Sequence, residues 1–189
     1  MHKKISEDLL IDGCIEGDRY AQKMLFEKYQ ATMFAICMRY AKNKMEAEDV
    51  MIDGFMVVYS SLSQFKGKGS FEGWIKRIMI NTAINNYRSN LKNYMSLSID
   101  DESYFEIKDE PEHHNEEFPT DVLMGMIQSL PEGYRMVFNL YEIEGYSHKE
   151  IAKLLDVSIG TTKTQLFHAK KALQNKIAIY KQGGYQNKK

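Results

Sequence analysis

A 3.6-residue apolar period runs through most of this 189-residue chain and constrains its fold more than any other feature. Apolar side chains that recur at i, i+3, i+4 and i+7 lie on one side of a helix, so repeated runs of this kind predict an all-α fold. The chain has only three prolines, and few runs are therefore interrupted by a helix-breaking residue. Because 43% of the residues are apolar, the expected helices have enough apolar surface to pack together.

The distribution of charge divides the chain into two folded parts. Residues 1–92 carry 14 lysines and arginines against 11 acids, whereas residues 93–119 carry one lysine against nine acids. The second stretch also loses the apolar period and is too polar to bury a core. We therefore predict a helical domain at 1–93, an acidic flexible linker at 94–119, a four-helix domain at 120–182 and a disordered tail at 183–189.

Several classes of protein are disfavoured by the sequence. Cys14 and Cys37 lie in helical apolar patterns, which favours core thiols in a reducing compartment over a disulfide or a metal pair. The chain starts without a secretory signal and has no apolar run of membrane-spanning length, so we expect a cytoplasmic protein without direct membrane insertion. His113 and His114 lie in the linker, where a metal site lacks preorganised ligands, and we expect no metal and no cofactor.

The first domain is expected to contain a helix with two different faces, from Met45 to about Ser63. A short broken helix over 5–20 and a longer one from Ala21, ending at Asn43 and Lys44, come before it. The inward residues of the Met45 helix are Ala47, Val50, Met51, Gly54, Phe55, Val58 and Leu62. Its reverse side mixes acids with apolar residues, which suits a helical protein partner, although a solvated face with two stray apolar residues fits equally well.

A loop rich in glycine and lysine follows, from Gln64 to Ser70. Glycine allows a ligand to approach the backbone closely, and lysine indicates that this ligand is anionic. The spacing is not that of a P-loop and no strand precedes it, which excludes nucleotide hydrolysis here. Ser70 is expected to cap the next helix, whose arginine and asparagine side, together with the loop and Phe65, suits single-stranded nucleic acid.

The second domain is expected to begin with two short helices. Val122, Leu123, Met126 and Leu130 predict an amphipathic helix, and Pro131 is placed to open the next. The inner face of that next helix is predicted to consist of Tyr134, Val137, Phe138 and Tyr141.

The stretch from Tyr146 to Leu173 has the pattern of a helix-turn-helix. Ser147 and Glu150 have the spacing of a capping box, and Ser158 is placed to cap a second helix after a short turn. Four residues of that second helix point inward together: Thr162, Leu166, Ala169 and Leu173. Its opposite side carries polar donors near the start and lysines further on, which is typical of a helix that reads the major groove. An αα-hairpin with a solvated lysine face also fits these residues.

Taken in order, these segments resemble the extracytoplasmic-function sigma factors, the small two-domain alternative sigma factors of bacterial RNA polymerase. Residues 46–55 are similar to the family's acidic polymerase-docking helix, and residues 65–81 to its promoter-melting segment. Residues 130–135 and the helix-turn-helix are similar to its second conserved domain. The resemblance implies a non-enzymatic protein that carries polymerase to promoters, reads the −35 element and captures a flipped base of the melted −10 element.

The resemblance also implies a role for each position. Contacts with the clamp helices of the largest polymerase subunit would involve Glu48, Asp49, Ile52, Asp53 and Met56. Contacts with the single strand of the −10 element would involve Phe65, Lys66, Gly67, Lys68, Ser70, Arg77, Asn81, Asn85 and Arg88. Contacts with the −35 duplex would involve Thr161, Lys163, Thr164, Gln165, Phe167, His168 and Lys171. The implied partners are core RNA polymerase, promoter DNA as duplex and single strand, and a membrane-linked anti-sigma factor.

Three positions depart from the family pattern. Ile52 stands where glutamine is usual, and Gln165 and His168 stand where arginine is frequent, so neither the docking surface nor the promoter sequence can be copied from relatives. Two other functions fit parts of the sequence. One is a stand-alone helix-turn-helix regulator whose first domain senses a ligand or dimerises, and the other is a nucleic-acid-processing enzyme with a metal in the acidic linker.

Overall fold

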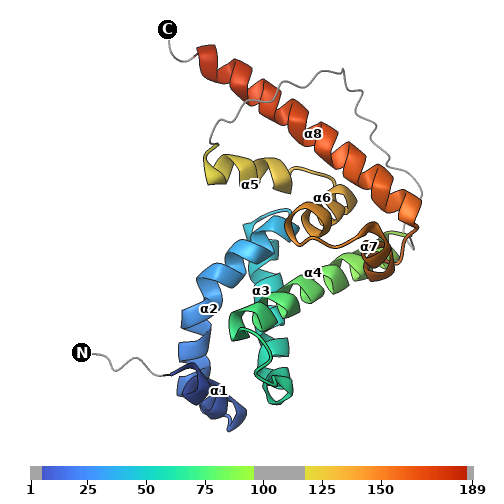
Figure 1. Cartoon of the computed structure of the whole chain (residues 1–189). Helices are drawn as coiled ribbons and strands as arrows, with labels where there is room; N and C mark the ends of the chain where they lie inside the picture. Colours follow the sequence, from blue (N-terminus) through green and yellow to red (C-terminus); the bar gives the residue numbers. More distant parts are fainter. Residues whose placement is uncertain (1–5, 96–117, 187–189) are drawn as a thin grey trace. The chain divides into compact units, whose positions relative to one another are not determined.

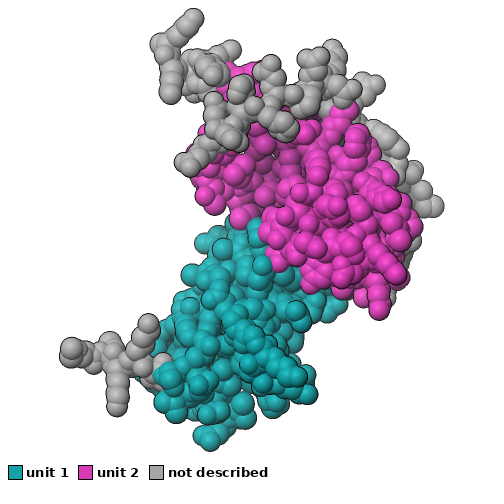
Figure 2. All heavy atoms as spheres, in the orientation of Figure 1, with its two compact units in different colours: residues 1–86 teal, residues 87–189 magenta. Residues whose placement is uncertain are grey.

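The computed structural model describes residues 6–95 and 118–186, and helices are the regular elements found in those two ranges (Figure 1). The predicted all-α fold is therefore confirmed. The chain divides into two compact units, residues 1–86 and 87–189 (Figure 2). This division falls inside one helix, and the domain bounds expected at 93, 119 and 182 stay predictions. Among the described helices, none has the length and apolarity needed to cross a bilayer.

The first unit is built from helices whose starts are fixed by polar side chains. Its elements are α1 (Glu7–Ile15), α2 (Arg19–Tyr40), α3 (Lys44–Ser61), the short 3₁₀ helix η1 (Leu62–Gln64) and α4 (Phe71–Met95), which continues beyond residue 86. Asn43 and Lys44 do not end α2 as expected. The Asn43 side chain instead accepts a hydrogen bond from the Glu46 amide at 2.9 Å, so it caps α3, and Lys44 is the first residue of that helix.

The core of the first unit lies between α2, α3 and α4. The seven inward residues predicted for the Met45 helix are all buried, six in α3 and the seventh, Leu62, in η1. Leu25, Met33 and Cys37 of α2, which packs against α3, are buried as well. Burial raises the pKa of the Cys37 thiol to about 12, and both cysteines are free and buried, as core thiols should be. Helix α4 approaches α3 at Gly54, where an added Cβ would overlap the Met79 sulfur.

The second unit contains a π-helical turn that the sequence pattern did not predict. Its elements are α5 (Thr120–Gln128), α6 (Glu132–Phe138), the π segment η2 (Asn139–Ile143), α7 (His148–Leu155) and α8 (Ile159–Gln186). Pro131 is the N-cap residue of α6 and not its first residue. Helix α8 continues past residue 182 to Gln186.

The π segment changes which side of this region faces the core. Val137 is fully buried as expected, but Met136, Asn139 and Leu140 are also buried, and Tyr141 is 36% exposed. A π turn accommodates an extra residue, so residues within it, such as Tyr141, are rotated away from the faces that a 3.6-residue period gives them. The predicted inner face is therefore wrong at Tyr141.

Replacing Gly54 by alanine should destabilise the first unit by about 1–3 kcal/mol, because the new methyl group must displace Met79 from a fully buried position. Urea unfolding followed by the fluorescence of Trp74, the single tryptophan, reports on this unit. Thr32→Ala, at an exposed position of α2 in the same unit, is the control. A Gly54→Ala protein as stable as the wild type would contradict the packing described here.

Candidate protein and nucleic-acid interfaces

The outer side of α3 combines exposed acids with exposed apolar residues. Asp49 and Asp53 are exposed. Ile52, which lies between them in the sequence, is 55% exposed, and Met56, which follows them, is 66% exposed. Large apolar side chains that stay in solvent next to fixed charges are typical of a protein-binding surface. Glu48, at the edge, forms a 3.6 Å ion pair with Lys44 one turn earlier. Four of the five residues predicted for polymerase binding thus lie unobstructed on one side of the helix.

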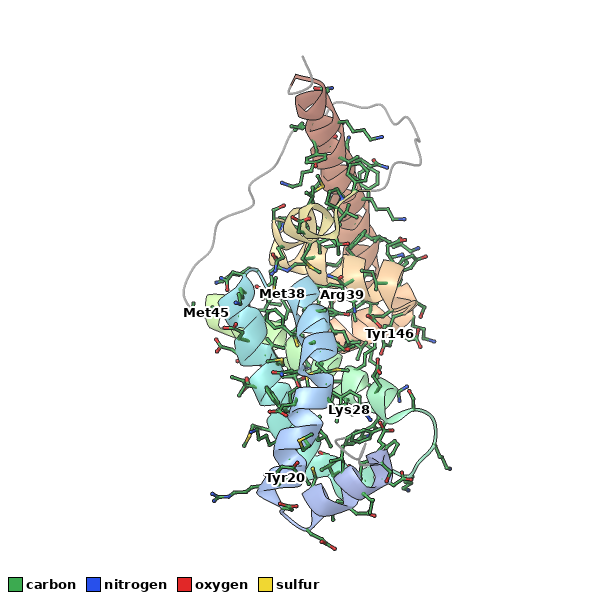
Figure 3. The ribbon with its side chains drawn as sticks, turned by 90° about the vertical axis from the view of Figure 1, so that its left-hand side faces the viewer. Tyr20, Lys28, Met38, Arg39, Met45 and Tyr146 are labelled. Atoms are coloured by element: carbon green, nitrogen blue, oxygen red, sulfur yellow. The ribbon has the colours of Figure 1, made fainter. Side chains whose placement is uncertain are left out.

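Sequence analysis missed one member of this surface. Met45 is 70% exposed and lies one turn before Asp49, at the start of α3 (Figure 3). The spacing 45, 49, 52, 53 and 56 keeps these five residues on one side of a helix, so continuing the pattern by one turn would have found it. We call Met45, Asp49, Ile52, Asp53 and Met56 the docking face.

The loop between η1 and α4 presents its backbone and lysines to solvent. Lys66, Gly67, Lys68, Gly69 and Ser70 are all exposed. Gly67 has φ +66° and Gly69 has φ +91°, conformations that side-chain-bearing residues rarely adopt, and an added Cβ at either glycine would meet no atom within 4 Å. The loop therefore leaves open space beside its backbone. As predicted, Ser70 caps α4, accepting a hydrogen bond from the Gly73 amide at 3.1 Å.

Three aromatic rings support this loop from the side of α4. The Phe65 ring centroid lies 5.0 Å from that of Phe71 and 5.5 Å from that of Trp74, and Phe71 and Trp74 stack at 5.6 Å with an 18° interplanar angle. Phe71 is buried, whereas Phe65 and Trp74 are half-buried. We call these three residues the aromatic cluster. Phe65 and Trp74 form the partly exposed side of this cluster.

One side of α4 continues the polar surface along the helix. Arg77, Asn81 and Asn85 are exposed and Arg88 is half-buried, and their spacing of four, four and three residues keeps them on one side. Guanidinium and amide groups at such positions bind phosphates and base edges. The loop, the aromatic cluster at its base and this side of α4 follow one another directly in the chain.

The helix-turn-helix has the caps that its sequence predicts. The Ser147 hydroxyl accepts from the Glu150 amide at 3.3 Å, and the Glu150 carboxylate accepts from the Ser147 amide at 2.8 Å, which completes the capping box. The hydrogen bond from the Ser147 hydroxyl lowers the pKa of Glu150. Asp156 ends α7 in a left-handed conformation at φ 59°, and Ser158 accepts from the Thr161 amide at 2.9 Å. The turn between the helices is therefore fixed at both ends.

The side of α8 that faces α6 holds two residues predicted to contact DNA. The His168 ring stacks on that of Tyr134 with centroids 5.6 Å apart, and a Cβ at Gly133 would lie 2.7 Å from the Gln165 amide nitrogen. The Gln165 carbonyl oxygen is buried and has no hydrogen-bond partner within the described residues. Both residues are only half-buried, yet their side chains pack against α6.

The outward side of α8 carries a smaller set of residues. Lys163 and Thr164 are exposed, and Phe167 is 60% exposed. Lys170, on the flank, forms a 2.7 Å ion pair with Glu142 of the π segment. Thr161 is half-buried and its hydroxyl lies 2.9 Å from that of Ser158, so it also serves the cap. Lys171, also half-buried, completes the predicted set.

A metal site finds no support in residues 6–95 and 118–186, where no group of three or more potential ligands comes together. The histidine pair at 113 and 114 and the acidic linker lie outside the described residues. The arrangement instead offers three binding surfaces: the docking face, the loop with its aromatic cluster, and the exposed side of α8.

Comparison with known proteins identifies both parts of the chain. Residues 25–92 match Sigma-70 region 2, and residues 120–173 match Sigma-70, region 4. The chain is 28% identical to the ECF RNA polymerase sigma-E factor of Haemophilus influenzae, over 94% of this chain and 98% of that relative. It is 29% identical to the ECF RNA polymerase sigma-E factor of Escherichia coli K12, over 94% of this chain and 97% of that relative.

Among solved structures, the chain is similar to the sigma factor RpoE in its complex with the anti-sigma factor NepR from Bartonella quintana. The TM-score is 0.49 at 17% identity, over 83% of this chain and 96% of that one. The two parts of the chain are identified by the sequence matches and not by this structural similarity.

The capping box should stabilise the helix-turn-helix measurably. Ser147→Ala removes one cap from α7 and should lower the stability of this region by about 1 kcal/mol. Amide hydrogen exchange in α7, measured at neutral pH, is the readout, and Ser147→Thr, which keeps the hydroxyl, is the control. Unchanged exchange in Ser147→Ala would show that tertiary packing alone holds the helix.

Proposed function

The chain belongs to the extracytoplasmic-function sigma factors of the sigma-70 family, and from this premise we propose how its three surfaces divide the work of initiation. Proteins of this family are not enzymes; they direct RNA polymerase to promoters. In our proposal the docking face binds polymerase, the loop and its aromatic cluster hold an unpaired promoter base, and α8 binds duplex DNA. The open loop backed by the half-buried Phe65 ring is the observation that carries the base-capture step.

The docking face supports binding to a basic, amphipathic partner helix, which we propose to be the clamp helices of the largest polymerase subunit. Asp49 and Asp53 supply charge, whereas Met45, Ile52 and Met56 supply apolar area that is lost to water on binding. Because Ile52 replaces the glutamine usual in the family, this contact is more apolar than in relatives. Glu48 contributes less, since Lys44 already pairs with it.

The loop supports capture of one base from the melted −10 element. A splayed base can enter the space beside Gly67 and Gly69, stack against the partly exposed aromatic cluster and hydrogen-bond with Asn81. Lys66 and Lys68 then neutralise the flanking phosphates, and Arg77, Asn85 and Arg88 hold the strand along α4. Binding energy alone performs this step, without any catalytic group.

The exposed side of α8 supports binding to the −35 element in the major groove. Lys163 and Lys171 serve phosphates or guanine, Thr164 donates to base edges, and Phe167 suits the methyl group of thymine. Gln165 and His168 pack against α6, so we propose that they orient α8 more than they read bases. Thr161 acts mainly through the cap of the helix.

Two further parts of the proposal follow from membership of the family. We expect an anti-sigma factor, linked to the membrane, that covers these surfaces until a signal releases them. We also expect the protein to act in the cytoplasm, where polymerase is. A stand-alone regulator would bind DNA without polymerase and would leave the docking face without a role.

Reversing both charges on the docking face should abolish polymerase binding. Asp49→Lys with Asp53→Lys should raise the Kd for core RNA polymerase about 100-fold or more, because charges at the centre of an interface are replaced by opposite ones. The binding of the fluorescently labelled protein to purified core polymerase is the measurement.

The matched control for this experiment reverses two acids at the C-terminal end of α1. Asp12→Lys with Glu16→Lys reverses two exposed acids at the same four-residue spacing, outside the docking face, and should leave the affinity unchanged. Normal polymerase binding by the Asp49 and Asp53 double variant would refute the docking role and favour the stand-alone regulator.

Removing the Asn81 amide should impair promoter opening without weakening duplex binding. Asn81→Ala leaves an exposed helical position intact, so the fold should be unaffected. We expect the permanganate reactivity of unpaired thymines to fall about three- to tenfold, the effect of one hydrogen bond to a base. Thr32→Ala, at an exposed position of α2, is the control. If the promoter thymines remain fully reactive to permanganate with Asn81→Ala, Asn81 does not contribute to the base pocket.

A further inference from the structure

One carboxylate of helix α1, that of Glu7, forms hydrogen bonds with two residues of α2. Glu7, the first residue of α1, accepts a hydrogen bond from the Tyr29 hydroxyl and another from Lys28 Nζ at 2.5 Å. The bond from Lys28 lowers the pKa of Glu7, so the carboxylate is charged at neutral pH. The two donors differ in exposure, because the Tyr29 side chain is buried and the Lys28 side chain is exposed. We call Glu7 and Tyr29 the latch.

The latch is connected to the loop through ring contacts. The Tyr29 ring meets that of Phe71 edge to face, with centroids 5.7 Å apart and an interplanar angle of 70°. Phe71 in turn contacts Phe65 and Trp74, the other two members of the aromatic cluster. Tyr29 is therefore one ring removed from Phe65, the residue on which the loop begins.

Helix α1 also touches the chain just before the loop. It packs against η1, which ends at Gln64, one residue before Phe65. The apolar side of α1, formed by Leu10, Ile11 and Cys14, is buried in this unit, and so is Leu62 of η1. Helix α1 thus borders the loop at two places: through η1 on the chain itself, and through Tyr29 on the rings that support it.

We propose that α1 positions the base-binding loop, and that Tyr29, held by Glu7, is the positioning residue. This inference rests on the base-capture function proposed above. The hydroxyl bond fixes the Tyr29 ring, the ring limits the movement of Phe71, and Phe71 fixes the plane of Phe65 against which the base stacks. Closely packed interiors transmit small displacements, so a shift of the Tyr29 ring reaches Phe65. Residues 7–15 precede the region that matches Sigma-70 region 2, which starts at residue 25.

Two single substitutions separate positioning from simple stabilisation. Tyr29→Phe keeps the ring and removes the hydroxyl, and Glu7 keeps its bond to Lys28. Ser6→Ala removes the N-cap of α1, where the Ser6 hydroxyl accepts a hydrogen bond from the Leu9 amide at 3.4 Å, but keeps the bond between Glu7 and Tyr29. Lys28 is unsuitable as the control because its Nζ also lies 4.8 Å from the centroid of the Tyr29 ring. Tyr29→Phe and Ser6→Ala both weaken α1, whereas only Tyr29→Phe frees the ring that contacts Phe71. Neither substitution touches the loop, the docking face or α8.

The test compares holoenzymes assembled with wild-type, Tyr29→Phe, Ser6→Ala and Asn81→Ala proteins at saturating core polymerase. Permanganate reactivity of promoter thymines reports opening, and acrylamide quenching of Trp74 in the free protein reports the mobility of the aromatic cluster. We expect Tyr29→Phe to lower reactivity about three- to tenfold and to increase quenching, since one partly buried hydrogen bond is lost. Ser6→Ala should stay within about twofold of the wild type in both, and all four proteins should bind core polymerase equally.

The outcomes distinguish this inference from the function on which it rests. Opening that is lost in Asn81→Ala but retained in Tyr29→Phe overturns the positioning role and leaves base capture standing. Equal losses of opening in Tyr29→Phe and Ser6→Ala, in proportion to their thermal stability, also overturn it, because the latch would then be only structural. Full opening in both Asn81→Ala and Tyr29→Phe overturns base capture, and the positioning role with it.

Discussion

The close approach of α3 to α4 at Gly54 is the contact on which the surfaces of the first unit depend. With no Cβ at this position, Met79 packs directly against α3, and apolar burial on both sides holds the two helices together. The outer side of α3 is the docking face, and α4 carries the arginine and asparagine side that follows the loop. The absence of a side chain at Gly54 therefore allows the close approach of the two helices that carry the proposed polymerase-binding and strand-binding surfaces.

Much of this architecture can be predicted from the sequence because helical periodicity determines which residues are buried. The inward face of α3, the caps at Ser70, Ser147 and Ser158, and the helix-turn-helix all follow from spacing and side-chain chemistry. The reassignment of Asn43 shows the limit of this reasoning. An asparagine between two helices can follow one or cap the next, and only the observed bond to the Glu46 amide decides.

What the sequence could not provide depends on backbone irregularity and on contacts distant in the chain. The π segment at 139–143 shifts its own residues off the faces of a regular helix, which leaves Tyr141 exposed, and a regular 3.6-residue period does not predict this shift. The packing of Gln165 and His168 against α6 depends on a glycine and a tyrosine more than 30 positions earlier. Likewise, Glu7 and Tyr29 meet across 22 positions, and neither belongs to a recognisable motif.

The magnitudes involved indicate why the proposed function needs both units. Extruding a base costs a few kcal/mol, and stacking it on an aromatic side chain returns about 1–3 kcal/mol, so the base capture that we propose roughly balances the cost of unpairing. In this proposal the net driving force for opening comes from polymerase bound at the docking face and from duplex DNA bound at α8. Because the two free energies at the loop are so close, the proposal makes opening sensitive to how firmly the Phe65 ring is held.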